Sequence, residues 1–424
     1  MGIHIKGGHL IDPANQVDKK SDVFIEDGKV TGIGKAPAGF KADTTIDASG
    51  KTVMPGIIDL QARFREPGLE HKATIASETR AAAASGITTL CLPPDTTPIL
   101  DTPAVVELIH RKNEAAGFAE ILPLGALTKG LAGDELSEMY ELKQAGCVGV
   151  TNARYPVAHT LVMRRAMEYA ANFELTIFLK PEDHSLTKGG CAHEGRISTR
   201  LGLPSVPEAA ETMAVARLLM LVEQTGVKAH FCQLSSAKAV QMIHRAQHDG
   251  LPVSADVASH HLYLSDMDIG YFDANCHVMP PLRDQRDRDG LRAGLLNGTI
   301  SAICSDHQPH ELDAKLAPFC ESEPGMSTLD TLLPLSLRLA DEIDISTSQV
   351  IACLTQHPAR ILGLPIGQLG LGYQADICIY DPEAHWTVSP DTLVSQGKNS
   401  PFMNWELKGQ VSHTLLAGQV VFQR

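Results

Sequence analysis

Polar and charged side chains that could do chemistry stand just after several short apolar runs of the chain. They are Gln61, Arg63 and Arg65 in QARFREPG, Lys180 in LKPED, Gln233 in HFCQ, and Asp306 with His310 in SDHQPH. Imidazole and carboxylate groups bind metal ions or move protons, whereas a guanidinium has no lone pair to offer a cation. Arg63 and Lys180 would therefore repel a metal ion rather than hold it.

A metal-free reaction is one alternative for this group of residues. Lys180, Asp306 and Arg63 would carry it, with the amine of Lys180 as the nucleophile. A buried lysine becomes nucleophilic when its pKa is depressed, but a neighbouring carboxylate raises that pKa and keeps the amine charged. The sequence does not favour this chemistry.

The cysteines offer little to a metal site. Nine of them are scattered along the chain without a C-x-x-C pair, which favours reduced core thiols over a disulfide framework. Cys304 lies two residues before Asp306 and should face the same side of its strand, while Cys232 adjoins Gln233 and should face the other way. We expect a buried core thiol at both positions.

Composition excludes several classes of protein. With 424 residues, 43% of them hydrophobic, the chain can fill a large core and is neither disordered nor fibrous. Its formal charge is −14 and only 5% of its residues are aromatic, so we expect no nucleic-acid partner. No apolar run approaches the roughly 20 residues of a membrane helix, and the N-terminus lacks the pattern of a signal peptide. These features predict a cytoplasmic protein without a membrane partner.

Eight apolar runs in the middle of the chain alternate with helical patterns, which is typical of parallel βα units. They cover residues 53–60, 88–92, 121–125, 148–152, 175–180, 229–234, 253–257 and 300–305. Eight such strands close a (β/α)8 barrel, which we expect over residues 54–365. An open doubly wound sheet is the alternative, but no Gly-rich phosphate loop follows the first run.

The two ends of the chain have a different pattern. Residues 1–53 and 366–424 alternate apolar and polar side chains between turns, as in IHIKGGHLID and ADICIYD, which predicts short antiparallel strands. We expect the two ends to form one composite β-sandwich domain. The predicted fold class is therefore α/β, a TIM barrel with a small second domain.

The segment PGIIDLQARFREPG closely resembles the first barrel strand of dihydroorotases in the amidohydrolase superfamily. The likeness continues through LKPEDHSL, HFCQLSSAKA, MPPLRDQRDRDG, CSDHQPH and KNSPF, so it covers nearly the whole chain. Dihydroorotases interconvert carbamoyl aspartate and dihydroorotate with a hydroxide that bridges two zinc ions. The resemblance therefore implies the barrel fold and a site at the ends of its strands.

The resemblance also implies six metal-binding positions, of which this sequence keeps one. Five are replaced, by Gln61, Arg63, Ala153, Lys180 and Gln233, and only the aspartate after the eighth strand, Asp306, remains. Asp306 matches the family's proton shuttle, but without a metal-bound hydroxide it has no reactive group to serve. We expect no bound metal or other cofactor and no active catalytic residue. Arg63 and Lys180 bring positive charge where the family has zinc, which predicts that one of them pairs with Asp306.

The implied substrate-binding positions are partly kept. Arg65 matches the arginine that binds the substrate carboxylate, and His310 matches a substrate-side histidine. Two asparagines of the family are replaced by Asp95 and Met279, and the negative charge of Asp95 should repel a dianionic substrate. Arg65 and His310 therefore either retain some anion binding or serve the structure, with Arg65 in a salt bridge to Glu66 or Asp95.

Three functions are compatible with these residues. The pattern resembles noncatalytic dihydroorotase-like proteins, which assemble with the catalytic chain of aspartate carbamoyltransferase in an oligomeric complex of pyrimidine (UMP) biosynthesis. An amidohydrolase-like enzyme with metal-free chemistry on a cyclic amide is the second function. A protein that senses carbamoyl aspartate or dihydroorotate without turnover is the third. We favour the noncatalytic subunit, because five of the six ligands are lost within an otherwise complete frame.

Overall fold

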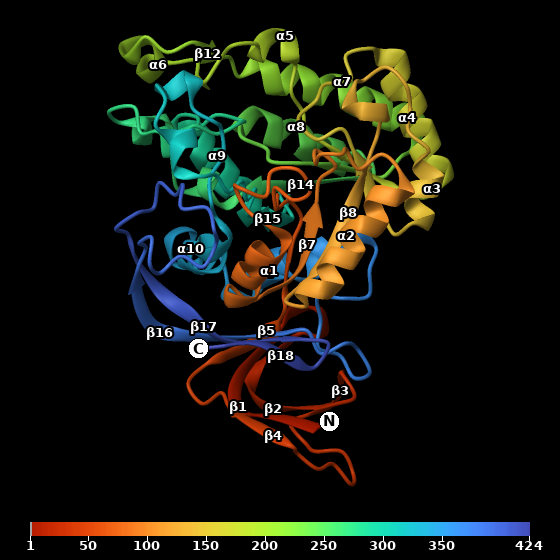
Figure 1. The fold of residues 1–424 in the computed structure, drawn as a ribbon, viewed down its shortest axis with the longest axis vertical. Coiled ribbons are helices and arrows are strands. Elements are labelled where there is room, and N and C mark those ends of the chain that lie inside the picture. Colours follow the sequence, from red (N-terminus) through yellow and green to blue (C-terminus); the bar gives the residue numbers. More distant parts are fainter. Residues whose placement is uncertain (1) are drawn as a thin grey trace.

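The computed structural model describes residues 2–424 and has two parts, a barrel and a terminal β-sheet. In Figure 1 the barrel with its helices fills the upper part, and the sheet formed by both ends of the chain lies below it. Among the described residues, no helix combines the length and the apolar character needed to cross a membrane.

Eight parallel strands form the barrel, as the alternation of apolar runs and helical patterns predicts. The strands are β6 (Ile57–Asp59), β7 (Ile87–Leu92), β8 (Glu120–Ala126), β9 (Gly149–Thr151), β10 (Thr176–Leu179), β13 (Ala229–Phe231), β14 (Val253–Ala258) and β15 (Ala302–Cys304). The ring closes just beyond β6 and β15, where Ala62 and His307 form a parallel bridge. There the amide of Arg63 donates to the carbonyl oxygen of His307 at 2.9 Å. The (β/α)8 barrel is therefore confirmed.

Helices connect and surround the strands (Figure 1). They are α1 (Ile75–Ala84), α2 (Pro103–Ala116), α3 (Met139–Gln144), α4 (Thr160–Asn172), α5 (His184–Thr187), α6 (Arg196–Leu201), α7 (Ala209–Thr225), α8 (Ala237–His248), α9 (Gln285–Leu296), α10 (Leu329–Ile343), α11 (Thr347–Leu354) and α12 (Gln356–Leu362). Local sequence sets their ends. Thr74 begins α1 with a capping box shared with Ser77, and Gly117 and Gly226 end α2 and α7 in the left-handed conformation.

The terminal sheet joins both ends of the chain in one hydrogen-bonded network. Its strands are β1 (Gly2–Asp12), β2 (Val17–Glu26), β3 (Lys29–Ile33), β4 (Thr44–Asp47), β5 (Thr52–Pro55), β16 (Ile377–Thr387), β17 (Glu406–Leu416) and β18 (Gln419–Gln423). Strand β5 links the two ends, because it pairs with β1 on one side and with β16 on the other. Some buried side chains of this sheet, such as Ile3, Val23 and Ile377, form a core of their own, whereas Met54, Cys378 and Val411 belong to the core of the barrel.

The predicted strand over residues 53–60 is in fact two strands. β5 belongs to the terminal sheet and β6 to the barrel, so the sheet extends to Pro55, beyond the expected boundary at residue 53. Gly56 separates them, and its amide donates to the carbonyl oxygen of Asp376 at 2.8 Å. A Cβ at Gly56 would lie 2.2 Å from Oγ1 of Thr88, so only glycine fits this crossing point.

The expectation that all cysteines are reduced is wrong for one pair. Cys191 and Cys320 form a disulfide across 129 residues, with their Cα atoms 5.4 Å apart. Cys191 precedes β11 (Ala192–His193), which pairs with β12 (Ser205–Val206) in a small flap between β10 and α7. The other seven cysteines are free and buried. Sequence spacing could not reveal the pair, because only the folded barrel brings the flap to the loop after β15.

Candidate functional site at the barrel mouth

The site residues expected from the sequence stand at the carboxyl ends of the barrel strands. Gln61, Arg63 and Arg65 follow β6, and Ala153, Lys180, Gln233 and Asp306 follow β9, β10, β13 and β15. Four of them have a positive φ, namely Arg65 at 62°, Ala153 at 50°, Gln233 at 48° and Asp306 at 46°. Non-glycine residues adopt this conformation rarely and at a cost of about 1–3 kcal/mol, typically at functional sites. Four of the twelve described non-glycine residues with a positive φ therefore stand at the carboxyl ends of the barrel strands.

Arg63 is the centre of a buried ion cluster. Its Nε donates to Oδ2 of Asp95 at 2.9 Å, and its Nη1 lies 3.5 Å from Oδ1 of Asp306. The side chains of Arg63 and Asp306 are 6% and 1% exposed, so water screens this pair little. The expected pairing of Asp306 with a cation is confirmed for Arg63. Asp95 is neutralised by the same guanidinium, so the repulsion expected from its charge is weakened.

The pKa values of the two carboxyl groups move in opposite directions. Burial raises the pKa of Asp306 above its usual value, against the opposing effect of Lys180 and Arg63. Burial acts on Asp95 too, but the guanidinium of Arg63 outweighs it and lowers the pKa of Asp95. Although burial works against the charged form of Arg63 as well, Asp95 and Asp306 raise the pKa of that guanidinium. Arg63 therefore stays charged and binds Asp95 as its main partner.

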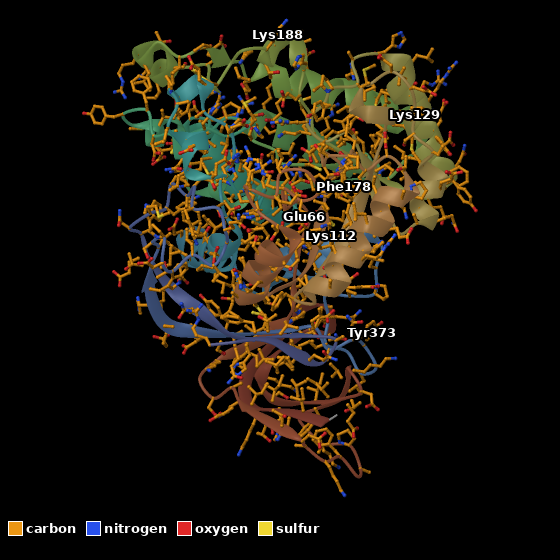
Figure 2. All side chains as sticks on the ribbon, in the orientation of Figure 1. Glu66, Lys112, Lys129, Phe178, Lys188 and Tyr373 are labelled. Carbon is orange, nitrogen blue, oxygen red and sulfur yellow. A yellow bond between two sulfur atoms is a disulfide. The ribbon has the colours of Figure 1, made fainter. Side chains whose placement is uncertain are left out.

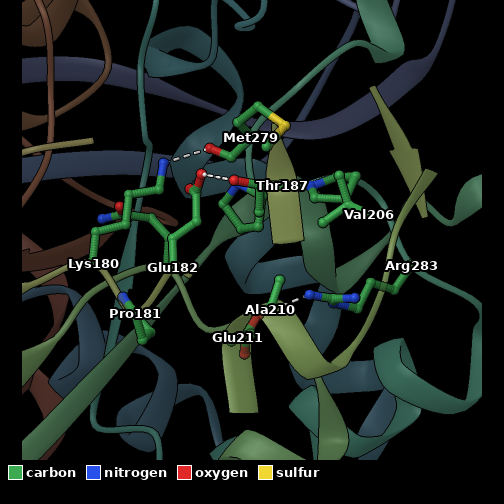
Figure 3. Close-up of a pocket in the computed structure, with 12 residues that line it drawn as sticks. Lys180, Pro181, Glu182, Thr187, Val206, Ala210, Glu211, Met279 and Arg283 are labelled. Carbon is green, nitrogen blue, oxygen red and sulfur yellow. Dashed lines mark hydrogen bonds and ion pairs between the residues drawn. The ribbon is translucent and has the colours of Figure 1, made fainter. Parts of the chain in front are cut away.

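Lys180 has a different partner from the one that its charge suggests. Its Nζ donates to the carbonyl oxygen of Met279 at 2.6 Å, as the dashed line in Figure 3 shows. Beside it, Thr187 donates to Oε1 of Glu182 at 3.0 Å, and the guanidinium of Arg283 faces Glu211 (Figure 3). The amine of Lys180 is thus held by a backbone carbonyl and still contributes positive charge near Asp306.

Arg65 and His310 contact each other. Nη2 of Arg65 lies 2.8 Å from Nε2 of His310, and Nε of Arg65 donates to the carbonyl oxygen of Pro309 at 2.9 Å. Nδ1 of His310 lies 3.2 Å from Nζ of Lys72. Burial, together with Arg65 and Lys72, lowers the pKa of His310 to about 2, so its imidazole is neutral. A neutral imidazole has one acceptor nitrogen, so it cannot accept from both cations.

The salt bridge expected between Arg65 and Glu66 or Asp95 is absent from the described residues. Glu66 instead accepts from Lys112, and the two side chains are labelled side by side in Figure 2. Burial, with Arg63 nearby, lowers the pKa of Arg65 to about 10. Asp95, one of the two carboxylates expected for Arg65, binds Arg63 instead.

The expected orientation of Cys232 is wrong. Its side chain packs inside the barrel with Cys304 and Phe178, the last of which is labelled in Figure 2. Alternation along a strand would place Cys232 and Gln233 on opposite faces, but Gln233 lies beyond the end of β13 and its positive φ turns the chain. Gln233 is buried too, with Nε2 4.0 Å from Sγ of Cys304.

Two groups of side chains could in principle offer ligands to a metal ion. In the first, His230, Cys232 and Asp256 lie together in the barrel core. Both ring nitrogens of His230 are already engaged, Nδ1 with Ser254 at 2.8 Å and Nε2 with Asp256 at 3.0 Å. Burial raises the pKa of Cys232 well above its usual value, so it is a thiol. This group is a hydrogen-bonded part of the core.

The second group is His193, Asp284 and Asp287, outside the barrel mouth. Nδ1 of His193 lies 3.3 Å from Nη1 of Arg283, so it accepts from that guanidinium. Asp284 and Asp287 lie at the start of α9, where Asp284 accepts from the amide of Asp287 at 3.0 Å. Asp284 thus caps α9, while Oδ1 of Asp287 accepts from the amide of Ala237 at the start of α8 at 3.0 Å.

Sequence reasoning missed a buried network that holds the mouth in place. Nε2 of His307 donates to Oε2 of Glu78 at 2.8 Å, and its Nδ1 accepts from the amide of Thr328 at 3.0 Å. Glu78 also accepts from Ser395 near the C-terminal end of the chain. Asp59 is fully buried against Ser305, and burial raises its pKa to about 6. The sequence signal that could have indicated this network is a single acidic residue, Glu78 or Asp59, within a mostly apolar segment.

Little space remains at the expected substrate positions. A cavity of about 20 Å³ lies beside Arg63, Arg65 and Asp95, and one of about 10 Å³ lies between Lys180 and Met279 (Figure 3). Such volumes hold about one water molecule each, whereas ligand pockets measure roughly 300–1,000 Å³. A groove of about 450 Å³ runs past Ala153 and Lys180 toward α7, but Arg65 and His310 do not line it. A cleft of about 680 Å³ lies away from the mouth, between the terminal sheet and α10 and α11.

Comparison with known proteins identifies the family. Residues 50–239 match the family described as Dihydro-orotase-like, and residues 313–422 match the amidohydrolase family. The chain is 47% identical over 423 residues to a dihydroorotase-like protein of Pseudomonas aeruginosa, with 100% of both chains covered. It is 42% identical over 423 residues to a dihydroorotase of Syntrophotalea carbinolica, with 100% of this chain and 99% of that one covered.

The fold has solved relatives as well. The structure superposes on an L-hydantoinase (dihydropyrimidinase) of Arthrobacter aurescens with a TM-score of 0.88 and 23% identity, covering 99% of this chain and 96% of that one. At this identity the likeness shows the fold alone. The full-length matches to the dihydroorotase-like sequences show that the chain belongs to the dihydroorotase-like family of the amidohydrolases.

Proposed function

We propose that this chain is a noncatalytic dihydroorotase-like protein, and that it serves as a structural subunit for the catalytic chain of aspartate carbamoyltransferase in de novo pyrimidine biosynthesis. The observation that carries the proposal is the position of Arg63, whose guanidinium binds Asp95 and faces Asp306. Asp306 is the carboxylate that the family would offer to zinc. In this chain the guanidinium of Arg63, and not a metal ion, balances the negative charge of Asp306.

The donor set at the mouth does not fit a binuclear zinc centre. Zinc takes three or four ligands from histidine, cysteine and carboxylate groups. Five of the six positions hold two amides, two cations and an alanine, which are Gln61, Gln233, Arg63, Lys180 and Ala153. Without zinc the pKa of water stays near 15.7, so essentially no hydroxide forms at neutral pH. The retained Asp306 then has no nucleophile to serve.

The retained backbone supports an inherited scaffold rather than a new enzyme. Ala153, Gln233 and Asp306 have positive φ angles, and they stand at positions where the resemblance implies metal-binding side chains, which two of the three lack. A metal-free nucleophile is not favoured either, since the amine of Lys180 donates to the carbonyl oxygen of Met279. We infer that a protein with this barrel but without the metal site acts through contact with another protein. The resemblance to noncatalytic dihydroorotase-like proteins makes carbamoyltransferase the proposed partner.

Sensing of carbamoyl aspartate or dihydroorotate is the second candidate function. Lys72 pairs with Glu311 at 3.6 Å, and Nε2 of His310 faces the carbonyl oxygen of Pro324 at 3.1 Å as well as Arg65, so Arg65 is the cation that an anion would satisfy. The cavity of about 20 Å³ beside Arg65 is too small for either molecule, so the side chains would have to move on binding. Calorimetry with each compound tests this function.

Co-expression with the carbamoyltransferase catalytic chain tests the main proposal. We expect the two chains to elute together in size-exclusion chromatography and the carbamoyltransferase to lose assembly or activity without this protein. Dihydroorotase assays in both directions, with and without added zinc, should give no turnover above background. Separate elution at micromolar concentration with a fully active transferase would refute the subunit role, and zinc-dependent turnover would refute the noncatalytic assignment.

A further inference from the structure

An apolar patch stands on the rim of the barrel mouth, on the loops that follow β14 and β15. It consists of Tyr271, Phe272, Leu312 and Leu316, whose exposed fractions are 101%, 46%, 75% and 78%. We name these four residues the rim patch. Single exposed apolar residues are ordinary, but a group of large ones surrounded by polar residues marks an interaction site.

The two loops of the rim patch are fastened to each other. Nζ of Lys315 donates to the carbonyl oxygen of Ala274 at 3.0 Å and to that of Glu323 at 2.6 Å. Nδ1 of His277 lies 3.0 Å from Oγ of Ser322. These contacts join the loop that carries Tyr271 and Phe272 to the loop that carries Leu312 and Leu316.

The backbone at Phe272 is strained. Its φ is 68°, a conformation that bulky residues avoid because the Cβ atom clashes with the backbone. Such a conformation costs on the order of 1 kcal/mol or more, and within this chain Phe272 is not buried in return. The strain holds an aromatic pair, Tyr271 and Phe272, toward solvent, where a partner could cover it.

Acidic residues surround the rim patch. Residues 266–273 and 311–323 contain one basic residue, Lys315, and six acids that are at least partly exposed, namely Asp268, Asp273, Glu311, Asp313, Glu321 and Glu323, of which Glu311 pairs with Lys72. Helix α6 packs near the first loop and adds the exposed Arg196 and Arg200, which leaves acids in excess. A second copy would bring like charges together, and anionic lipid or nucleic acid would be repelled. The negative charge around the rim patch is instead complementary to a basic surface on another protein.

We propose that the rim patch is the docking surface for a different protein, one that presents an apolar recess ringed by lysine and arginine side chains. The inference rests on the proposed function and assigns this surface to contact with the carbamoyltransferase catalytic chain. Aromatic and leucine side chains fill the recess, while the acids steer the approach of the partner and fix its orientation. The barrel mouth thus keeps a role as a rigid base for two binding loops.

Paired serine substitutions test the apolar contact. Tyr271→Ser with Leu316→Ser removes the two most exposed members of the rim patch, and both side chains are exposed, so the fold should survive. The matched control is Met213→Ser with Met220→Ser on α7, where the exposed fractions are 59% and 64%. We expect the Kd for the catalytic chain to rise at least about 10-fold in the rim variant and to stay within about 2-fold in the control.

Charge reversal tests the steering role of the acids. Asp313→Lys with Glu321→Lys should slow association and weaken the salt dependence of the association rate, because the long-range attraction is reduced. Glu114→Lys with Glu223→Lys, two exposed acids on α2 and α7, is the control with the same change of net charge. Equal association rates in all three proteins would show that the acids play no part in docking.

The binding measurements distinguish a failure of the rim-patch proposal from a failure of the proposed subunit function. If the wild-type chain does not bind the catalytic chain, the proposed function fails. If it binds and the folded rim variant binds equally well, the rim patch is not the docking surface while the proposed function stands. Circular dichroism checks folding, and Leu312→Ser with Leu316→Ser, confined to one loop, replaces the first pair if that pair unfolds.

Discussion

Arg63 and Asp306 face each other inside the barrel, with Nη1 of the arginine 3.5 Å from Oδ1 of the aspartate. The two residues are 243 positions apart and meet because β6 and β15 close the ring. Arg63 also holds Asp95 at 2.9 Å, so one guanidinium serves two buried carboxylates. Because Arg63 lies closer to Asp95 than to Asp306, loss of each of the three side chains should have a different effect on stability.

Removing the arginine should destabilise the protein more than removing either acid. We expect Arg63→Met to lower the free energy of unfolding by about 3–5 kcal/mol, because it leaves two buried carboxylates without their cation. Asp306→Ala should cost about 3 kcal/mol, since Arg63 keeps Asp95. Asp306→Asn, which preserves volume, should cost less. Urea denaturation measures all three, and an Arg63→Met variant as stable as the wild type would contradict the buried cluster.

Substitution at the barrel mouth should leave the proposed complex with carbamoyltransferase functional. Asp306→Asn removes the last carboxylate of the family's metal site but no surface contact. We expect carbamoyltransferase activity of the complex to remain within about 2-fold of wild type, a change of less than about 0.5 kcal/mol. The comparison requires equal amounts of folded complex. A loss of activity in a complex that still assembles would mean that the mouth, and not only contact, contributes to function.

The thiol count distinguishes the paired cysteines from the free ones. Protein unfolded without reductant should show seven reactive thiols per chain, because Cys191 and Cys320 are joined. Full reduction should raise the count by two, and Cys320→Ser should add one thiol without reduction. Thiol titration with a chromogenic disulfide reagent makes the measurement. Nine thiols in the unreduced wild type would show that the pair stays reduced, as the sequence predicts.

Acidification should destabilise the fold through buried histidines. Burial lowers the pKa of His193, His261 and His277 to about 4 and that of His310 to about 2. Between these values and the unfolded pKa near 6.5, the unfolded chain binds more protons. Stability therefore falls as pH drops below about 6.5, by up to about 1.4 kcal/mol per pH unit for each histidine.

Buried acids with raised pKa values oppose this trend, among them Asp59 and Asp306. Burial raises the pKa of Asp59 to about 6, so between about 4 and 6 the folded chain binds the extra proton and acid stabilises it. The unfolded pKa of histidine near 6.5 lies inside the range from pH 7 to pH 5, whereas the ordinary pKa of a carboxyl group lies below it, so we expect a net loss of stability over this range. Urea midpoints at pH 7, 6 and 5 measure it. His310→Gln should show a shallower decline, and an unchanged slope would mean that His310 is not held neutral.

The sequence by itself determined the architecture. Eight apolar runs alternating with helical patterns predict the eight barrel strands, because burial on both faces requires continuous apolar segments. The resemblance to dihydroorotases located Gln61, Arg63, Lys180, Gln233 and Asp306, and the charges of Arg63 and Lys180 were enough to predict an ion pair with Asp306. These conclusions depend only on residue types and on their spacing along the chain.

The tertiary structure decided which partners those residues have. Lys180 and Arg63 offer the same charge, yet only the fold sets Arg63 against Asp306 and turns Lys180 to the carbonyl oxygen of Met279. Alternation failed at Cys232 because the positive φ of Gln233 ends the strand pattern. The disulfide between Cys191 and Cys320 spans 129 residues. Contacts between distant segments depend on how strands and loops meet in space. The order of residues along the chain does not specify the distances between such segments.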